Sequence, residues 1–267
     1  MHCRFRRAVC LFLIVLLCFS LSPSASALAA LPELFCEAAL VIHPDTNLVL
    51  YAKNPDRQLA CSSLVKIMTA ILALEHFTDL SQTLEVSATA LENLSGVATA
   101  GLKEGEVLTV EQLLYCLLLP SAADAANTLA EGVSGDIDSF VELMNQKAEA
   151  LSMNNTHFVN TYGRDDALQY TTASDMAKLV QYAMKNQIFC DIVSTQYKRI
   201  SKTNLSGDRY YFSNNALVIS SVDRREIEDY YYRYADRHLH RGWLQPGRLL
   251  RQGRHAADHR DFGLHAR

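Results

Sequence analysis

Short apolar runs separated by polar turns predict β-strands near both ends of the central part of the chain. Residues 38–42 and 48–52 are almost wholly apolar, and residues 43–47 between them include proline, aspartate and asparagine. Those residue types favour tight turns, so the two runs predict a β-hairpin. Residues 192–200 and 210–212 also have the composition of strands.

Longer segments with apolar residues at helical spacing predict five helices. They are residues 64–74, 110–119, 121–131, 136–151 and 174–186. Ser62 and the pair Ser174-Asp175 are the expected N-caps of the first and last, because short polar side chains accept hydrogen bonds from free amides there. The first helix is apolar on most sides, so we expect it to be central and buried. Three acidic residues of the loops are expected to be solvated: Asp79, Glu104 and Glu106.

Composition narrows the class of protein. The 267 residues are 49% hydrophobic with a net charge of −4, enough to bury one large core or two modest ones. No basic stripe and no zinc-type spacing of cysteine and histidine precedes the last 32 residues, so neither a nucleic-acid partner nor a metal or other cofactor is predicted. Four cysteines outside the leader are expected to be buried free thiols rather than disulfides: Cys36, Cys61, Cys116 and Cys190.

The first 27 residues have the features of a secretory signal peptide. Three arginines precede the apolar run of residues 8–21, and Ala25-Ser26-Ala27 has the pattern of a cleavage site. The run is short for a membrane span, although an uncleaved N-terminal anchor is the alternative. We therefore expect a secreted or extracytoplasmic protein of the cell envelope.

The candidate chemistry begins with Ser63 and Lys66. Residues three apart on a helix share a face, so the two side chains can meet. Burial disfavours a charged amine, and a neutral lysine can take the proton from a serine hydroxyl. Taken alone, the spacing is equally that of a helix that begins with serines and carries a lysine one turn later. His76 and His157 are expected to be packing or surface residues.

Several stretches together give this pair a family context. From about Glu37 to about Ala235 the chain resembles the serine-type D-Ala-D-Ala carboxypeptidases, the low-molecular-weight penicillin-binding proteins of the peptidase S11 family. That family carries S-x-x-K, S-x-N and K-T-G motifs. The matching stretches are Ser63-Leu64-Val65-Lys66, Leu117 to Ala126 around Ser121, Tyr170 to Met176, and Ser213 to Leu217. The resemblance implies an α/β fold: an antiparallel sheet flanked by helices, with an all-helical subregion that carries Ser121.

The resemblance also implies roles for three residues. Ser63 is the implied acyl-ester nucleophile, Lys66 its general base and Ser121 a proton relay. The implied substrate is a peptidoglycan stem peptide ending in D-Ala-D-Ala, and β-lactams are the implied covalent inhibitors. No cofactor is implied, and no membrane anchor is visible.

Two departures from the family pattern leave other functions open. Ala123 stands where S-x-N has asparagine, and no Lys-Thr-Gly follows Asn215, the last lysine being Lys202. Neither Asp124 nor Asn127 is assumed to replace the missing amide. A non-catalytic relative, either a truncated product or a peptidoglycan-binding pseudoenzyme, is the first alternative. A β-lactamase is a weaker one, since it needs a deacylating carboxylate that the sequence does not identify.

The composition changes abruptly after Ala235. Residues 236–267 contain seven arginines and five histidines but no lysine, valine or isoleucine. An out-of-frame reading of a GC-rich gene explains such a tail, and a divergent tail is the alternative. The expected organisation is therefore a signal peptide at 1–27, a partial carboxypeptidase domain at 28–235 with an incomplete sheet, and an aberrant tail at 236–267.

Overall fold

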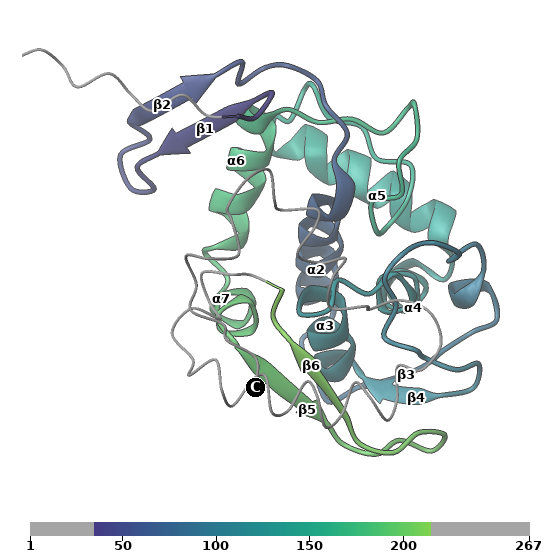
Figure 1. Cartoon of the computed structure of the whole chain (residues 1–267). Coiled ribbons are helices and arrows are strands. Elements are labelled where there is room, and N and C mark those ends of the chain that lie inside the picture. Colours follow the sequence, from purple (N-terminus) through teal and green to yellow (C-terminus); the bar gives the residue numbers. More distant parts are fainter. Residues whose placement is uncertain (1–34, 215–267) are drawn as a thin grey trace, which may run out of the picture. The chain divides into compact units, whose positions relative to one another are not determined.

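The computed structural model describes residues 35–214, and all of its helices and strands lie between Ala39 and Phe212 (Figure 1). The helices are α2 (Val65–His76), α3 (Val110–Leu118), α4 (Ala123–Ser134), α5 (Ile137–Ala150), α6 (Ala173–Ala183) and α7 (Gln187–Val193). Two 3-10 turns are η1 (Ser62–Leu64) and η2 (Thr89–Leu91). The strands are β1 (Ala39–Ile42), β2 (Val49–Lys53), β3 (Thr83–Glu85), β4 (Val107–Thr109), β5 (Tyr197–Ile200) and β6 (Arg209–Phe212).

Helix α2 lies at the centre of the other helices, as its apolar sequence predicted (Figure 1). It packs against α3, α4, α5 and α6. Ala70, Ile71 and Ala73 join an apolar cluster with α3 and α4, whereas Val65 and Met68 join a second cluster with α5 and α6. Because burial of apolar surface is the main stabilising term, α2 holds both halves of the core together.

The strands pair as three separate antiparallel hairpins, β1–β2, β3–β4 and β5–β6. The predicted first hairpin is confirmed, with Ala39 opposite Lys53. A single sheet flanked by helices was expected, but residues 35–214 contain only these two-stranded pieces. The strands that the resemblance implies after Asn215 lie outside the described residues. Apolar side chains of the first hairpin are exposed to solvent: Val41, Leu48, Val49 and Leu50.

Two predicted helix caps are wrong. Ser62 does not cap α2, because its backbone has φ +47° and enters the 3-10 turn η1, which leads directly into the helix. An N-cap normally has extended backbone. The side chain of Thr172, not that of Ser174, accepts the hydrogen bond from the backbone amide of Asp175 and caps α6.

One strand prediction is right only in its second part, Tyr197–Ile200. Residues 192–200 were expected to be extended, but α7 runs to Val193 and β5 begins only at Tyr197. The side chain of Asn186 caps α7 by accepting from the amide of Phe189. Phe189 and Ile192, three residues apart, are buried on one face of the helix. The cap and this spacing favour a helix over a strand.

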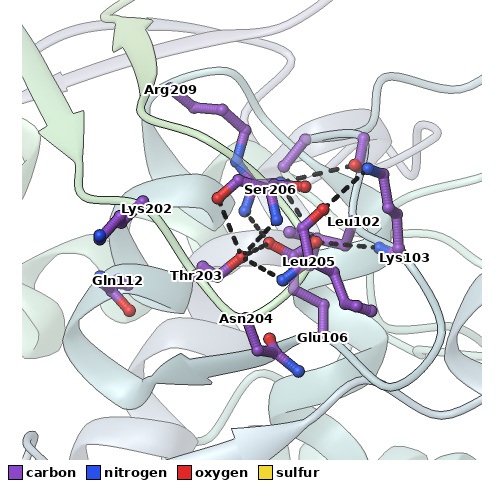
Figure 2. A network of polar contacts seen from close by, with 12 residues as sticks. Leu102, Lys103, Glu106, Gln112, Lys202, Thr203, Asn204, Leu205, Ser206 and Arg209 are labelled. Carbon is purple, nitrogen blue, oxygen red and sulfur yellow. Dashed lines mark hydrogen bonds and ion pairs between the residues drawn. The ribbon is translucent and has the colours of Figure 1, made fainter.

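Glu106 was expected to be a solvated loop charge, and this is wrong as well. Its side chain is 0% exposed and forms an ion pair with Arg209 of β6. Figure 2 shows the polar network around it: the carboxylate also accepts from the amide of Lys103 at 3.1 Å and the hydroxyl of Thr203 at 2.6 Å. Asn204 donates to the carbonyl of Gly105. The network therefore joins residues 101–107 to the β5–β6 hairpin, and its members are far apart in sequence.

The four cysteines that the structure describes are free, as predicted, but only two of them are buried. Cys61 and Cys116 are buried, Cys190 is half-buried and Cys36 is exposed. Burial raises the pKa of the Cys61 thiol to about 11 and that of Cys116 to about 12. Both thiols are therefore protonated at neutral pH and act as small apolar side chains.

Within residues 35–214, no helix is long and apolar enough to cross a bilayer.

Candidate active site

Ser63 and Lys66 lie on one continuous helical stretch but in contrasting surroundings. Ser63 is the middle residue of the turn η1 and is exposed. Lys66 is in the first turn of α2 and is only 6% exposed. The arrangement presents a hydroxyl to solvent directly before a buried amine.

Among residues 35–214, the Lys66 amine has no counter-charge. Its Nζ donates a hydrogen bond to the carbonyl of Tyr162 at 2.5 Å, and no carboxylate among the described residues forms an ion pair with it. Burial lowers the pKa of Lys66 to about 8, because desolvation disfavours the ammonium form. A sizeable fraction of this amine is therefore neutral near physiological pH and can accept a proton.

The segment Thr161-Tyr162-Gly163 packs against this turn, and the sequence-based prediction missed it. Thr69, one turn after Lys66, donates to the carbonyl of Thr161 at 2.6 Å. Consecutive carbonyls of the segment thus receive hydrogen bonds from α2. A Cβ on Gly163 would lie 1.8 Å from the carbonyl oxygen of Ser62, and Gly163 has φ +92°. Only glycine allows this approach.

Side-chain amides fix the loop that carries this segment. The Oδ1 of Asn160 accepts from the amides of Gly163 at 2.7 Å and Arg164 at 3.1 Å. The Oε1 of Gln169 accepts from the amides of Val159 and Asn160. Asparagine followed three residues later by glycine is typical of such side-chain-stabilised turns, and it is the one sequence signal that could have pointed to this loop.

Ser121 lies between α3 and α4 in a strained backbone conformation. It is half-buried and has φ +63°, which is uncommon for a residue other than glycine. The amide of Ala122 donates to the Cys116 carbonyl, and that of Ala123 to the Ala98 carbonyl. Helix α4, which begins just after Ser121, packs against α2. Among the described residues, no hydrogen bond joins Ser63, Lys66 and Ser121 to one another.

The two polar residues nearest to Ala123 are engaged elsewhere. The buried carboxylate of Asp124 accepts from the amides of Ala100 at 2.8 Å and Leu102 at 3.0 Å. Burial raises its pKa, and the backbone hydrogen bonds partly offset that rise. Asn127 is hydrogen-bonded to Ala90 and Thr161. Neither side chain bonds directly to Lys66.

Both histidines singled out from the sequence, His76 and His157, make packing contacts. The Nδ1 of His157 is hydrogen-bonded to the Leu168 carbonyl, and its ring lies 6.1 Å from that of Tyr170. His76, at the end of α2, makes an edge contact with Phe77. In the part of the chain that the structure describes, no group of three or more histidine, cysteine, aspartate or glutamate side chains could hold a metal ion.

Residues 25–224 match the family model of the peptidase S11 D-alanyl-D-alanine carboxypeptidases. The chain is 31% identical over 225 residues to D-alanyl-D-alanine carboxypeptidase DacF of Bacillus subtilis, covering 80% of this chain and 56% of the relative. It is 31% identical over 197 residues to D-alanyl-D-alanine endopeptidase of Escherichia coli, covering 73% of this chain and 59% of that relative. The chain therefore spans little more than half the length of these two relatives.

The fold is similar to that of a DD-transpeptidase whose structure has been solved. The crystal structure of the Streptomyces K15 DD-transpeptidase has a TM-score of 0.66 and 29% sequence identity. The superposition covers 71% of this chain and 78% of that one. The predicted α/β fold class of the penicillin-binding proteins is thus confirmed. The chain belongs to the peptidase S11 family of D-alanyl-D-alanine carboxypeptidases.

Proposed function

We propose that this chain is a serine-type D-Ala-D-Ala carboxypeptidase that removes the terminal D-alanine from peptidoglycan stem peptides. The observation that carries the proposal is the exposed Ser63 placed one turn before the buried Lys66, which has no carboxylate partner among residues 35–214. Family membership supports the substrate class, because the relatives are named for the D-alanyl-D-alanine group.

In the proposed reaction, the Ser63 hydroxyl attacks the carbonyl carbon of the penultimate D-alanine, and the neutral Lys66 amine accepts its proton. The C–N bond then breaks. Ser121 gives its hydroxyl proton to the leaving amine and takes one from the Lys66 ammonium, so that Lys66 is neutral again. The amine departs as D-alanine, and the rest of the peptide stays on Ser63 as an ester. Water hydrolyses the ester and restores Ser63. A β-lactam would acylate the same oxygen through its strained amide.

The strained backbone of Ser121 and the close fit of Gly163 support preorganisation of this site. Strained conformations persist where the surrounding structure fixes them, and they cluster at active sites. Fixing reacting groups in place before the reaction accounts for a large share of enzymatic rate enhancement.

The cellular setting belongs to the same proposal. Residues 1–27 would direct the chain out of the cytoplasm to the peptidoglycan, and residues 28–235 would form the partial catalytic domain. The tail 236–267 would lie outside that domain, whether it arises from a frameshift or from divergence. Sequencing the gene across codons 234–242 distinguishes these two origins.

A non-catalytic peptidoglycan-binding relative is the second candidate. Two features of the sequence favour it: Ala123 replaces the asparagine of S-x-N, and no lysine follows Lys202 to supply K-T-G. The family motif's lysine would bind the substrate carboxylate and help to keep Lys66 neutral. In this chain burial alone lowers the pKa of Lys66.

Release of D-alanine from a synthetic stem peptide ending in D-Ala-D-Ala separates the two candidates. We expect purified wild-type protein to release D-alanine and Ser63→Ala to release none. Equal release by both proteins would contradict the role of Ser63. Peptidoglycan binding without release by the wild type would favour the non-catalytic relative, and rapid hydrolysis of a penicillin would indicate a β-lactamase.

A further inference from the structure

In the described part of the chain, one backbone carbonyl orients the Lys66 amine, that of Tyr162. A loop carbonyl can orient a side chain only if the loop itself is fixed. The hydrogen bonds of Asn160 and Gln169 hold the loop in its own conformation. Thr69 of α2 holds the Thr161 carbonyl, and Asn145 of α5 is hydrogen-bonded to the backbone of Phe158. On the side facing α4, a further contact holds the side chain of the residue next to Tyr162.

That contact is made between Thr161 and Asn127. The Thr161 hydroxyl donates to the Oδ1 of Asn127 at 2.6 Å, and the Nδ2 of Asn127 donates to the Ala90 carbonyl at 3.0 Å. Thr161 is 0% exposed and Asn127 is 3% exposed. The amide of Asn127 is thus anchored to η2 and in turn anchors the residue that precedes Tyr162.

The position of Asn127 on α4 relates this contact to the S-x-N motif. Asn127 lies four residues, about one helical turn, after Ala123 and therefore shares its face. Ala123 occupies the position at which the family pattern has an amide side chain. In this chain an amide stands one turn further along the same face and reaches the Lys66 region through Thr161 and the backbone of Tyr162.

We propose that Asn127 and Thr161 are positioning residues that hold the Tyr162 carbonyl where it orients the Lys66 amine for proton transfer. This inference rests on the proposed acylation of Ser63. The alternative is a purely structural role, in which the two buried polar side chains satisfy each other's hydrogen-bonding groups and stabilise the fold without affecting the site.

Thr161→Val tests the proposal because it removes the hydroxyl and keeps the shape of the side chain. The matched control is Thr128→Val. Thr128 is equally buried, but its hydroxyl donates to the Asp124 carbonyl within α4 and not to the loop. Thr161→Ser keeps the hydroxyl and serves as the rescue, and Asn127→Ala removes the other partner of the same contact.

The first readout is the acylation of the full chain by a fluorescent penicillin, measured to saturation. We expect Thr161→Val and Asn127→Ala to lower the maximal acylation rate by about tenfold to a hundredfold, as for other displaced catalytic groups. The concentration for half-saturation should stay near that of the wild type. Thr161→Ser should recover most of the rate, and Thr128→Val should acylate normally. Equal rates in Thr161→Val and Thr128→Val would overturn the proposal.

The second readout does not depend on acylation. The carbon-13 resonance of the Lys66 Cε, identified by its loss in Lys66→Met, reports the pKa of the amine. A carbonyl acceptor favours the ammonium form, so Thr161→Val should lower this pKa and Thr128→Val should leave it unchanged. An unchanged or raised pKa in Thr161→Val overturns the positioning role. A wild type that titrates as expected but takes no penicillin would refute the proposed function alone.

Discussion

Lys66 and Glu106 are both charged residues buried within the core, yet their surroundings differ. Glu106 has a guanidinium partner, a hydroxyl donor and an amide donor (Figure 2). Among the residues that the structure describes, Lys66 has one hydrogen-bond partner, the neutral carbonyl of Tyr162. Burial of an ion is costly unless a partner compensates it. Glu106 is therefore a structural charge, whereas Lys66 avoids part of the cost by losing its proton more readily.

Two kinds of buried charge can be distinguished by their partners. A fully paired group such as Glu106 fixes chain segments, here the loop of residues 101–107 and strand β6. A buried and unpaired group with a perturbed pKa, next to an exposed nucleophile, is the pattern expected of an active site. The following predictions test whether the two groups differ in this way.

The largest expected effect is the loss of acylation in Lys66→Met. General base catalysis contributes about 10²- to 10⁴-fold, so the penicillin acylation rate should fall by that factor. The free energy of unfolding should stay equal to that of the wild type or rise, because the variant removes a buried cation without a counter-ion. Stopped-flow acylation and urea unfolding measure the two quantities. A large loss of stability would show that Lys66 is structural.

Glu106→Gln should have the opposite profile. It leaves the Arg209 guanidinium, whose side chain is only 17% exposed, without its counter-charge, and breaking a buried pair costs about 3–5 kcal/mol. Urea unfolding should therefore show a large fall in stability. At a temperature where the variant is still folded, its acylation rate should stay near that of the wild type. A stability equal to that of the wild type would remove the contrast with Lys66.

The pH dependence of acylation should follow Lys66. Burial lowers the pKa of Lys66 to about 8, so the ammonium form predominates below that pH and cannot accept the serine proton. The rate should rise about tenfold per pH unit below the pKa and become constant above it. A rate that is constant from pH 6 to 9 would exclude Lys66 as the base. Pre-steady-state acylation across this range supplies the test.

The smallest effect is expected for Glu111→Gln, which also removes an acid bonded to the β5–β6 hairpin. Glu111 of α3 pairs with Lys198 of β5 at 3.0 Å, but its side chain is 49% exposed. Exposed pairs contribute about 0–1 kcal/mol. The free energy of unfolding measured with urea should therefore fall by no more than about 1 kcal/mol. A loss as large as that of Glu106→Gln would mean that burial does not separate the two pairs.

Local sequence predicted the features that depend on near neighbours. The first hairpin, the buried character of α2 and the helix predicted at residues 110–119 all follow from apolar spacing and turn residues. The Ser63–Lys66 pair was found because both residues lie on one short helical stretch. Family resemblance added Ser121, which no local pattern identifies.

The features that depend on distant residues were not predicted. The local sequence predicts Glu106 to be a solvated loop charge, because its partner Arg209 lies more than a hundred residues later in the chain. The contact of Gly163 with Ser62 likewise joins segments that nothing in the sequence pairs. Helix α7 was missed because its short apolar run suits a strand as well as a buried helix. Long-range packing decided the first two cases, and an ambiguous local pattern the third.

The location of a penicillin adduct tests most directly whether Ser63 and Lys66 are the reacting pair. Full-length protein is incubated with benzylpenicillin. Mass spectrometry of the intact protein then counts the adducts, and peptide mapping locates them. We predict one adduct per chain, on Ser63, which is lost in Ser63→Ala and retained in Ser201→Ala, a variant of another exposed serine. An adduct on a different residue, or an unmodified wild-type chain, would contradict the assignment of Ser63 and Lys66 as the reacting pair.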